Sequence, residues 1–596
     1  MRSRAAVVFV VTLLGVSFST GCSNGPSSPG GTGGGDAGSS GGAGAGEGCL
    51  SVPLDDTPVL TAPKSPPPVS GGTMVVMSSG LVAIGDSDRD EVHFVDSNWA
   101  ATHVQLQERD EPGRIVEGPA GSVFVALRGT HEVAQVDATT LSVSRYDACP
   151  APRGLAWRAD SMRLLVACPD GELVTLDFSQ PGPPVRSAVQ VAGDLRDVLI
   201  SHGQVLVTTF RAPQVFAVAA DGTVTPWSEP VAVSNGMLNF VPRVGYRTIA
   251  TQGGLVMVHQ VEETTAIPAA TACVSPYGDS GGEPPVVPVV SVLSEGNAAP
   301  LGRLPNEALP IDVAVTSDGS GAAVVMFGSR TVHVMSPGQP GVFFPLKLDS
   351  EPVAVAYTGN PAHPTLLVFS REPAQLTAFD DQRQVIAPVS LSPVSMASTG
   401  HLLFHRQTAG GIACASCHPE AGDDGHVWNL PAGMRRTPSL RGGLKGTEPF
   451  HWNGEEPDMS TLVTDVLVAR MGGNPEPAAN TSALLDWMDA QPKRPSPGNL
   501  DAAAVARGEA SFAALGCNSC HAGAAGTDNR YADVGTGESL QVPRLVELAY
   551  RAPFFHDGRI ATLADRFTKA GGSAHTGISG LSAAQISDLV AYLQSR

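Results

Sequence analysis

The chain has 596 residues, more than one hydrophobic core normally organises, so we expect two or three domains. A formal charge of -20 argues against a nucleic-acid partner, because phosphate binding requires basic patches. Glycine (67) and proline (49) are frequent, whereas aromatic residues make up only 5% of the chain. This composition favours a turn-rich, β-heavy fold over a helical one.

Residues 1–22 have the pattern of an export signal. The basic start MRSR is followed by the apolar run AAVVFVVTLLGVSF and by STGC, which ends at Cys22. Such a segment is typical of a cleaved signal rather than a spanning helix. The Gly-Cys pair after a small residue resembles a bacterial lipobox, which implies a lipoprotein signal peptide and lipidation of Cys22. Ordinary signal-peptidase cleavage is the alternative. Ser23 after the cysteine implies an anchor in the outer membrane, on its periplasmic or cell-surface side.

Residues 23–54 are expected to form a flexible Gly/Ser-rich tether, because residues 23–48 hold no apolar side chain larger than alanine. No later segment has the run of about 18 to 20 apolar residues that a membrane span needs. Export also implies an oxidising compartment, in which cysteines pair. Apart from Cys22 and the cysteines of two Cys-x-x-Cys-His motifs, the chain has four cysteines: Cys49, Cys149, Cys168 and Cys273. Four cysteines can form two disulfides in three different pairings. Their short separation favours Cys149 with Cys168.

A sequence pattern repeats with a period of about forty residues through residues 55–395. The segment EPGRIVEGPAGSVFVALRGTHEVAQVD recurs with the same order of apolar strands and polar turns, at 111–137, 151–177, 193–219, 309–335 and 351–379, with poorer copies near 70–97 and 236–260. This period is that of a four-stranded propeller blade. We therefore expect an all-β propeller of about seven blades rather than a β-sandwich, with a loop insertion at PAATACVSPYGDSGGEPPVVPVV. The pattern resembles the YVTN family of surface propellers, although the YVTN tetrapeptide is absent.

The propeller sequence does not disclose a function by itself. Its histidines are scattered singly among apolar strands, at His93, His131, His202 and His333. A single histidine in such a place is more often satisfied or exposed than a ligand, so no metal is assigned to these four. Binding, scaffolding or shielding is the expected role of this domain.

Two Cys-x-x-Cys-His motifs carry the chemistry. They consist of Cys414, Cys417 and His418, and of Cys517, Cys520 and His521. This motif attaches c-type haem: the two thiols bond the haem vinyl groups, and the histidine becomes the proximal ligand of the iron. Zinc is the alternative, but the cysteine pairs of zinc ribbons lie about 15 to 20 residues apart. Here they are about a hundred residues apart.

The flanks of the two motifs repeat one another. Each motif is followed by the same skeleton of Pro-Phe, a histidine, Gly and Thr-Leu, as in EPFHWNGEEPDMSTL and APFFHDGRIATL. Each half then closes with a predicted helix, the first over 480–491 and the second after the capping-box pair Ser582 and Gln585. We therefore expect two all-α c-type cytochrome domains and a linker, at 396–491, 501–596 and 492–500.

The C-terminal third resembles the bacterial di-haem cytochrome c peroxidase superfamily, which includes the methylamine-utilisation haem enzymes. The segment PFFHDGRIATL is close to the characteristic turn of that family. The resemblance implies two small helical domains with one covalently attached haem c each, electron transfer between the haems, and calcium as an accompanying ion. It says nothing about the propeller.

The same resemblance places the sixth ligands of the two haem irons. VARMGG puts Met471 at the position of the family's axial methionine in the first half. TKAGG puts Ala570 at that position in the second half, where His575 is the nearest alternative ligand, with Lys569 behind it. Methionine raises the potential of a haem and histidine lowers it. The family usually has its His/Met haem in the second half, so the assignment is reversed here.

Several residues near the motifs have two open roles. His451 and His556 belong to the shared turn and are either catalytic or orient the backbone and the haem propionates. His426 is expected to be a loop histidine, with a removable haem ligand as the alternative. No single residue is selected as the glutamate that assists O–O cleavage in the family; the candidates are Glu455, Glu456 and Glu538.

Arginines near the motifs are candidate partners of the haem propionates, because a guanidinium binds a carboxylate in a bidentate manner. A surface role is the alternative for each of Arg441, Arg544 and Arg559.

The expected function is that of an exported di-haem electron-transfer protein that reduces hydrogen peroxide with electrons from a redox partner protein. A non-catalytic lipid-anchored carrier, or a redox relay for a propeller that binds a partner, is the alternative. A peroxidase needs one haem whose sixth position opens, whereas a carrier keeps both haems six-coordinate.

Overall fold

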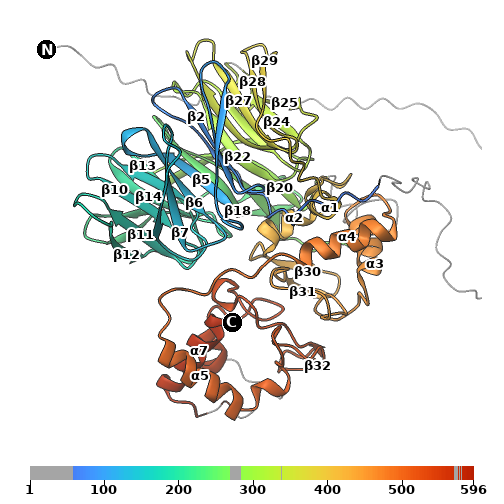
Figure 1. Ribbon diagram of the computed structural model, residues 1–596. Coiled ribbons are helices and arrows are strands. Elements are labelled where there is room, and N and C mark those ends of the chain that lie inside the picture. The colour runs from blue at the N-terminus through green and yellow to red at the C-terminus, as the bar shows by residue number, and fades with distance from the viewer. Residues whose placement is uncertain (1–57, 269–282, 337, 570–574, 576–577, 579) are drawn as a thin grey trace, which may run out of the picture. The chain divides into compact units, whose positions relative to one another are not determined.

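The structure, a computed structural model, describes residues 58–268, 283–336, 338–569, 575, 578 and 580–596 (Figure 1). The chain divides into the units Met1–Cys49 and Leu50–Arg596, and every described residue belongs to the second unit. The expected signal peptide and tether lie outside the described residues, as do Cys22, Cys49, Cys273 and Ala570. Among the described helices, none is both long and apolar enough to cross a membrane.

Residues 74–390 fold into seven consecutive antiparallel sheets, which are the blades of a β-propeller (Figure 1). The expected fold and the count of seven blades are confirmed, and the β-sandwich alternative is wrong. Blades 1 to 4 consist of β1 (Met74–Val76), β2 (Val82–Asp86), β3 (Glu91–Val95), β4 (Ala101–Gln105), β5 (Pro112–Glu117), β6 (Ser122–Leu127), β7 (Glu132–Asp137), β8 (Val143–Asp147), β9 (Leu155–Arg158), β10 (Arg163–Ala167), β11 (Glu172–Asp177), β12 (Val185–Gln190), β13 (Leu195–Ser201), β14 (Gln204–Thr209), β15 (Val215–Val218) and β16 (Val224–Ser228). Blades 5 to 7 consist of β17 (Val233–Ser234), β18 (Asn239–Thr251), β19 (Gly254–Glu263), β20 (Val286–Ser294), β21 (Asn297–Arg303), β22 (Pro310–Val315), β23 (Ala322–Met326), β24 (Thr331–Met335), β25 (Phe343–Lys347), β26 (Pro352–Thr358), β27 (Thr365–Arg371), β28 (Ala374–Phe379) and β29 (Val385–Ser390).

Each blade buries its inner strands and exposes its outer edge. In blade 1, β2 is buried along its whole length, whereas β4 is mostly exposed. The inner strands are rich in Val, Leu, Ile and Ala, which suit a pleated surface packed between two neighbours. The innermost strands contact one another around the ring, and β1 of the first blade reaches β26 of the last. No described blade takes strands from both ends of the chain, so side chains must hold the ring closed.

A disulfide joins Cys149 to Cys168. Cys149 lies between blades 2 and 3, and Cys168 directly follows β10, so the bond fixes the connection between these blades to the centre of blade 3. This is the pairing that the short separation in sequence favoured.

The region after the propeller is only partly helical. Each of its halves contains one two-stranded antiparallel sheet, so the expectation of two all-α domains is not confirmed. The first half contains α1 (Thr399–His405), α2 (Cys414–Cys417), β30 (Val427–Leu430), β31 (Gly433–Arg436), α3 (Met459–Leu462), the π-helical η3 (Val463–Arg470) and α4 (Ala478–Asp489). The second half contains α5 (Ala502–Ala514), η4 (Cys517–Ser519), β32 (Tyr531–Ala532), β33 (Leu540–Gln541), η5 (Leu548–Tyr550), α6 (Leu563–Thr568) and α7 (Ala583–Ser595). Among the described residues, short 3-10 turns also occur at η1 (Pro119–Gly121), within blade 2 of the propeller, and at η2 (Pro419–Ala421), directly after the first motif.

Both halves pack their first helix against their last. In the first half α1 lies on α4, and in the second half α5 lies on α7. A glycine stands at each contact: a Cβ atom on Gly400 would lie 2.1 Å from the Ala483 carbonyl oxygen, and one on Gly508 would lie 2.0 Å from the Asp588 carbonyl oxygen. The matching contacts support the duplication. The predicted capping box of Ser582 with Gln585 is present at the start of α7.

We expect Gly508→Ala to lower the free energy of unfolding by about 1 to 3 kcal/mol, although alanine has the higher helix propensity. The added methyl group would collide with the backbone of α7, which cannot rotate away as a side chain can. Denaturant unfolding of the full chain measures this change. Glu509→Ala, at an exposed neighbouring position on α5, is the control, and equal stability of both variants would contradict the close helix contact.

Candidate haem sites

The first Cys-x-x-Cys-His motif is shaped by a single helical turn. Cys414 and Cys417 are the first and last residues of α2, and His418 follows directly. Residues three apart lie on one side of a helix, so both thiols face the same way. Burial raises the pKa of the Cys414 thiol to about 11, so this thiol is protonated at neutral pH. This is the arrangement that thioether bonds to one prosthetic group require.

The proximal histidines of both motifs are held in the same way. His418 donates Nδ1–H to the carbonyl oxygen of Gly422 at 3.3 Å, and His521 donates Nδ1–H to that of Gly526 at 3.0 Å. These bonds leave Nε2 as the nitrogen with a free lone pair. Burial lowers the pKa of His418 to about 4 and also lowers that of His521, so both rings are neutral at pH 7. A neutral imidazole is the form that binds iron.

A cavity of about 640 Å³ adjoins the first motif. His418 and both cysteines line it, and Met471 lies in its wall. Most of the other lining is apolar or aromatic, including Phe404, Trp428, Phe450 and Leu484. Two thiols, a neutral imidazole and a thioether around one large apolar cavity fit a haem c with histidine and methionine as axial ligands.

The second motif faces His575. The ring centroids of His521 and His575 lie 6.4 Å apart, with the ring planes inclined by only 14°. Two imidazole nitrogens bonded to one metal at about 2 Å each would bring their ring centroids to about 6 Å from one another. Burial lowers the pKa of His575 to about 3, so this ring is also neutral, and its Nδ1 is buried without a hydrogen-bond partner. These two residues fit the axial positions of a second haem.

The two histidines of the shared turn, His451 and His556, do not occupy equivalent positions in the two halves. An isolated β-bridge joins Phe450 to Glu456 in the first half and Phe554 to Ile560 in the second. Counted from these bridges, His451 corresponds to a phenylalanine of the second half, and His556 corresponds to Trp452. The additional phenylalanine in Pro-Phe-Phe-His shifts the second histidine by one position.

The two histidines consequently have different surroundings. His451 lines the first cavity, and its Nδ1 lies 2.9 Å from Glu455. Glu456 is the third member of this cluster, at 3.8 Å from the same nitrogen. His556 packs edge-on against Trp452 and lies 3.5 Å from Glu538. The structure thus brings His451 and Glu455 to the wall of the first cavity, and Glu456 lies beside His451.

Of the three predicted propionate partners, Arg544 is the one that lines the first cavity, although it belongs to the second half of the region. Arg441 donates to the carbonyl oxygens of Glu420 and Pro492, and Arg559 forms an exposed ion pair with Asp557. Sequence reasoning missed four further arginines in this wall: Arg435, Arg436, Arg470 and Arg551. Their positions directly before TPSL, before Met471 and before APFF are the signal that could have identified them.

The loop after the first motif is docked on the propeller through Glu420. Its carboxylate lies 2.6 Å from Arg196, 3.5 Å from Arg153 and 3.5 Å from Arg128. These arginines belong to blades 4, 3 and 2, or directly adjoin them, and all four side chains are largely buried. Burial alone would raise the pKa of Glu420, but the three guanidinium groups outweigh it and hold the pKa well below the ordinary range.

Further contacts extend this docking along the loop. Asp423 pairs with Arg211 of the propeller at 2.9 Å. Gln260 on β19 donates to the carbonyl oxygen of Ser416 at 2.6 Å, within the motif itself. The backbone N–H of Ile267 donates to the carbonyl oxygen of Asn429 at 2.8 Å. The propeller therefore fixes the first motif and the strand that follows it.

A pair of buried carboxyl groups lies where this loop meets β19. Glu262 and Asp424 are both fully buried, and each has one oxygen without a hydrogen-bond partner. Burial raises the pKa of both carboxyls, and repulsion from Asp424 adds to the effect at Glu262 while repulsion from Asp423 adds to it at Asp424, so the pair retains a proton near neutral pH. His426 donates Nε2–H to the carbonyl oxygen of Glu263 at 3.0 Å, and its Nδ1 lies 3.6 Å from Glu262. His426 is thus bonded to the propeller, as a loop histidine would be.

Comparison with known proteins agrees with the second motif. The family model for cytochrome c matches residues 505–596. These residues form a cytochrome c domain. Such a domain implies a covalently bound haem c with its iron and indicates haem-based electron transfer. The match includes Cys517, Cys520 and His521 and leaves the first motif outside it.

Among solved structures, virginiamycin B lyase from Staphylococcus aureus is 8% identical, with a TM-score of 0.37, over 52% of this chain and 94% of that one. Hydrazine synthase from Kuenenia stuttgartiensis is 13% identical, with a TM-score of 0.44, over 56% of this chain and 100% of that one. Comparison with curated proteins finds no match to the sequence.

We expect Glu420→Gln to lower the free energy of unfolding by about 3 to 5 kcal/mol, because it removes the one carboxylate that three buried arginines share. Denaturant unfolding measures the loss. Asp160→Asn is the control, because it breaks an exposed ion pair with Arg158 and should change the stability by less than about 1 kcal/mol. Equal effects of the two substitutions would show that the loop is not anchored in this way.

Asp424→Asn should alter the pH dependence of stability. A carboxyl whose pKa is raised in the folded state stabilises the fold fully below its unfolded pKa of about 4 and less as the pH rises through its folded pKa. The asparagine variant does not titrate, so it should gain stability relative to the natural chain as the pH rises from about 4 past neutrality. Denaturant midpoints across this range measure the difference. Parallel curves would contradict a shared buried proton.

Proposed function

We propose that this protein is a di-haem c-type cytochrome that accepts single electrons and passes them on. The cytochrome c domain supports one haem, on Cys517, Cys520 and His521. The proposal of a haem at the first motif as well rests on the structural similarity between the two halves of the region. There, His418 donates Nδ1–H to a glycine carbonyl as His521 does, and it faces a large apolar cavity with Met471 in its wall. We propose the domain limits 396–491 and 501–596 for the two haem modules.

Unequal sixth ligands support a direction of electron flow. We propose Met471 as the sixth ligand at the first site and His575 at the second. Bound haem supplies one-electron redox chemistry, with a higher potential under methionine ligation and a lower one under histidine ligation. Electrons would then move from the second site to the first. The residues of the chain hold each imidazole neutral and fixed in orientation, which limits the rearrangement that accompanies a change of charge.

Peroxide reduction is the second candidate function, and the position of His451 favours it. His451 and Glu455 form a hydrogen-bonded pair on the wall of the first cavity, where an acid–base group would be placed to move a proton. The proposal requires the Met471 side chain to leave the sixth position in one oxidation state. His556 lies against Trp452 instead, and we propose a supporting role for it in the turn.

We propose that the protein is exported and anchored to the outer membrane through a lipid on Cys22, with a small redox protein as its electron partner. The disulfide between Cys149 and Cys168 is in keeping with an oxidising compartment. The motifs of haem attachment, which takes place outside the cytoplasm, support the same location. The propeller serves here as the platform of the first site, and a partner that binds the propeller is the alternative.

A reductive titration of the holoprotein, followed by absorption and EPR, tests this function. We expect two haems per chain, two separated midpoint potentials, and low-spin six-coordinate iron at every stage. A single haem per chain would overturn the di-haem proposal. A high-spin five-coordinate haem in the half-reduced state would instead favour peroxide reduction, and peroxide turnover should then be assayed with the natural chain and with His451→Gln.

Substitution of the ligands assigns each potential to a site. Met471→Leu should make one haem high-spin and lower the higher of the two potentials, whereas Met488→Leu, in the wall of the same cavity, should change neither. His575→Gly should make the other haem high-spin, and added imidazole should restore the low-spin form. Identical spectra for Met471→Leu and Met488→Leu would exclude Met471 as a ligand.

A further inference from the structure

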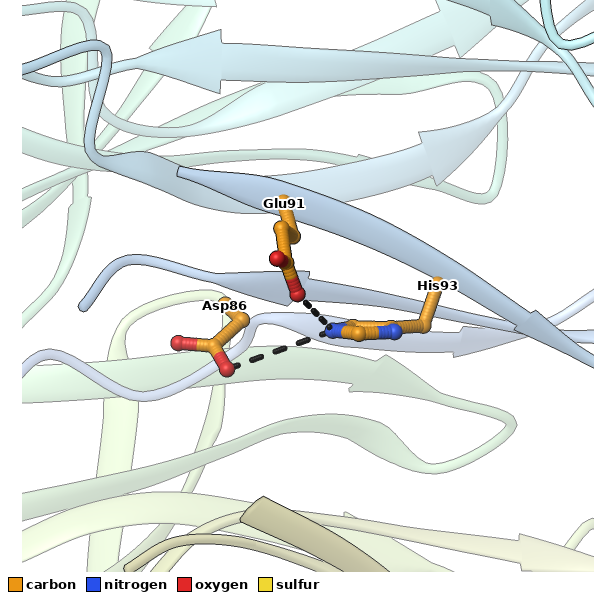
Figure 2. Close-up of side chains that lie close together, drawn as sticks. All are labelled: Asp86, Glu91 and His93. Atoms are coloured by element: carbon orange, nitrogen blue, oxygen red, sulfur yellow. Dashed lines mark ion pairs between the residues drawn. The ribbon is translucent and has the colours of Figure 1, made fainter. Parts of the chain in front are cut away.

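Three side chains of blade 1 converge inside the propeller, far in sequence from the haem motifs. Asp86 ends β2, and Glu91 and His93 lie on the adjacent β3, where Asp86 is the direct partner of Glu91 (Figure 2). His93 Nε2 lies 3.2 Å from a Glu91 carboxylate oxygen and 4.0 Å from an Asp86 carboxylate oxygen. His93 and Asp86 are at most 1% exposed, whereas the Glu91 side chain retains 13% of its surface.

The polar atoms of this cluster are not satisfied by one another. Both ring nitrogens of His93 are buried without a hydrogen-bond partner, and so is the Glu91 oxygen that faces Nε2. A buried polar atom without a hydrogen-bond partner costs about 1 to 3 kcal/mol, and a ligand shared by His93 and Glu91 would remove this cost.

The separations match those between ligands of one metal ion. Ligand atoms at about 2.0 to 2.1 Å from a tetrahedral zinc ion lie about 3.3 Å from one another. The observed 3.2 and 4.0 Å lie on either side of this value. One imidazole nitrogen with two carboxylates suits zinc and similar transition metals better than calcium or magnesium, which prefer oxygen alone.

Charge around the cluster leads to the same conclusion. Arg89 donates to Asp86 at 2.9 Å, and its other terminal nitrogen lies 3.3 Å from Glu372 of blade 7. Asp86 and Glu372 thus share a single guanidinium group. Asp86 keeps a second lone pair on the oxygen that Arg89 contacts, so it can bind an ion as well. A divalent cation would neutralise the remaining negative charge.

We propose that Asp86, Glu91 and His93 bind a zinc ion that stabilises the closure of the propeller ring. Arg89 connects this cluster to the last blade, through Glu372 and the carbonyl oxygens of Arg371 and Val394. Because no described blade exchanges strands between the chain ends, contacts of this kind hold blade 1 against blade 7. An ion at Asp86 would fix the residue from which this connection starts.

Blade 6 supplies a matched control. His333 on β24 pairs with Val324 as His93 pairs with Ile84, so the two histidines have equivalent positions in their blades. His333 is also buried without a hydrogen-bond partner, but it faces one carboxylate, that of Glu307 at 3.0 Å. The position equivalent to Asp86 is Met326. Blade 6 therefore has the histidine without the pair of acidic ligands.

The test is zinc binding to the full-length holoprotein, in which haem attachment consumes the motif thiols. After treatment with a chelator, ZnCl₂ is returned, unbound metal is removed, and zinc per chain is measured by elemental analysis. We expect one zinc ion per chain in the natural protein and in His333→Gln. In Glu91→Gln and His93→Gln the affinity should fall at least tenfold. Zinc should also raise the unfolding midpoint of the natural chain, because it binds only the folded form.

Two results would overturn the proposal. One is a folded natural chain that retains no zinc. The other is unchanged zinc affinity in Glu91→Gln, a conservative substitution at a partly exposed side chain that leaves the fold intact. Should His93→Gln fail to fold, Glu91→Gln alone decides. This outcome is independent of the electron-transfer function, since haem content and midpoint potentials are expected to remain as in the natural protein.

Discussion

The burial of Glu420 among three arginines is the interaction on which the arrangement of the first candidate haem site depends. A carboxylate taken out of water is tolerated only where cations compensate for its lost hydration. Here the cations come from three separate blades, so the pocket for Glu420 exists only when those blades are already packed together. The loop that carries Cys417 and His418 is therefore positioned by a domain that is distant in sequence. The propeller acts as the template for the first site, whatever else it binds.

The two proposed haem modules share a common frame but differ in their surroundings. Each has a glycine at its helix crossing and a proximal histidine bonded to a glycine carbonyl. The first module adds the anchored loop, the buried carboxyl pair and the large cavity, whose wall also includes residues of the second module such as Arg544. The two sites are thus similar in frame and unequal in their surroundings. Such inequality would suit the stepwise electron transfer that we propose.

Sequence patterns predicted those features that depend on local spacing. The period of about forty residues indicated seven blades, and Ser582 with Gln585 marked the start of a helix that is present. The match of the second motif to cytochrome c was likewise foreseeable from five consecutive residues. The sequence could not indicate that Glu420 would meet Arg128, Arg153 and Arg196, because nothing local distinguishes it from a surface glutamate. His93 was likewise predicted to be an isolated histidine, because Asp86 reaches Glu91 and His93 only when β2 pairs with β3.

Every described blade of the propeller is made of strands that follow one another in the chain. Each blade is therefore encoded by one continuous segment of sequence. A tandem duplication or deletion of about forty codons would add or remove one whole blade without changing the strand order of any other blade. The similarity of the repeated segments is what such a history would leave behind. Only the junction between the first and last blades would have to be remade, and that junction includes charged side chains that single substitutions can alter.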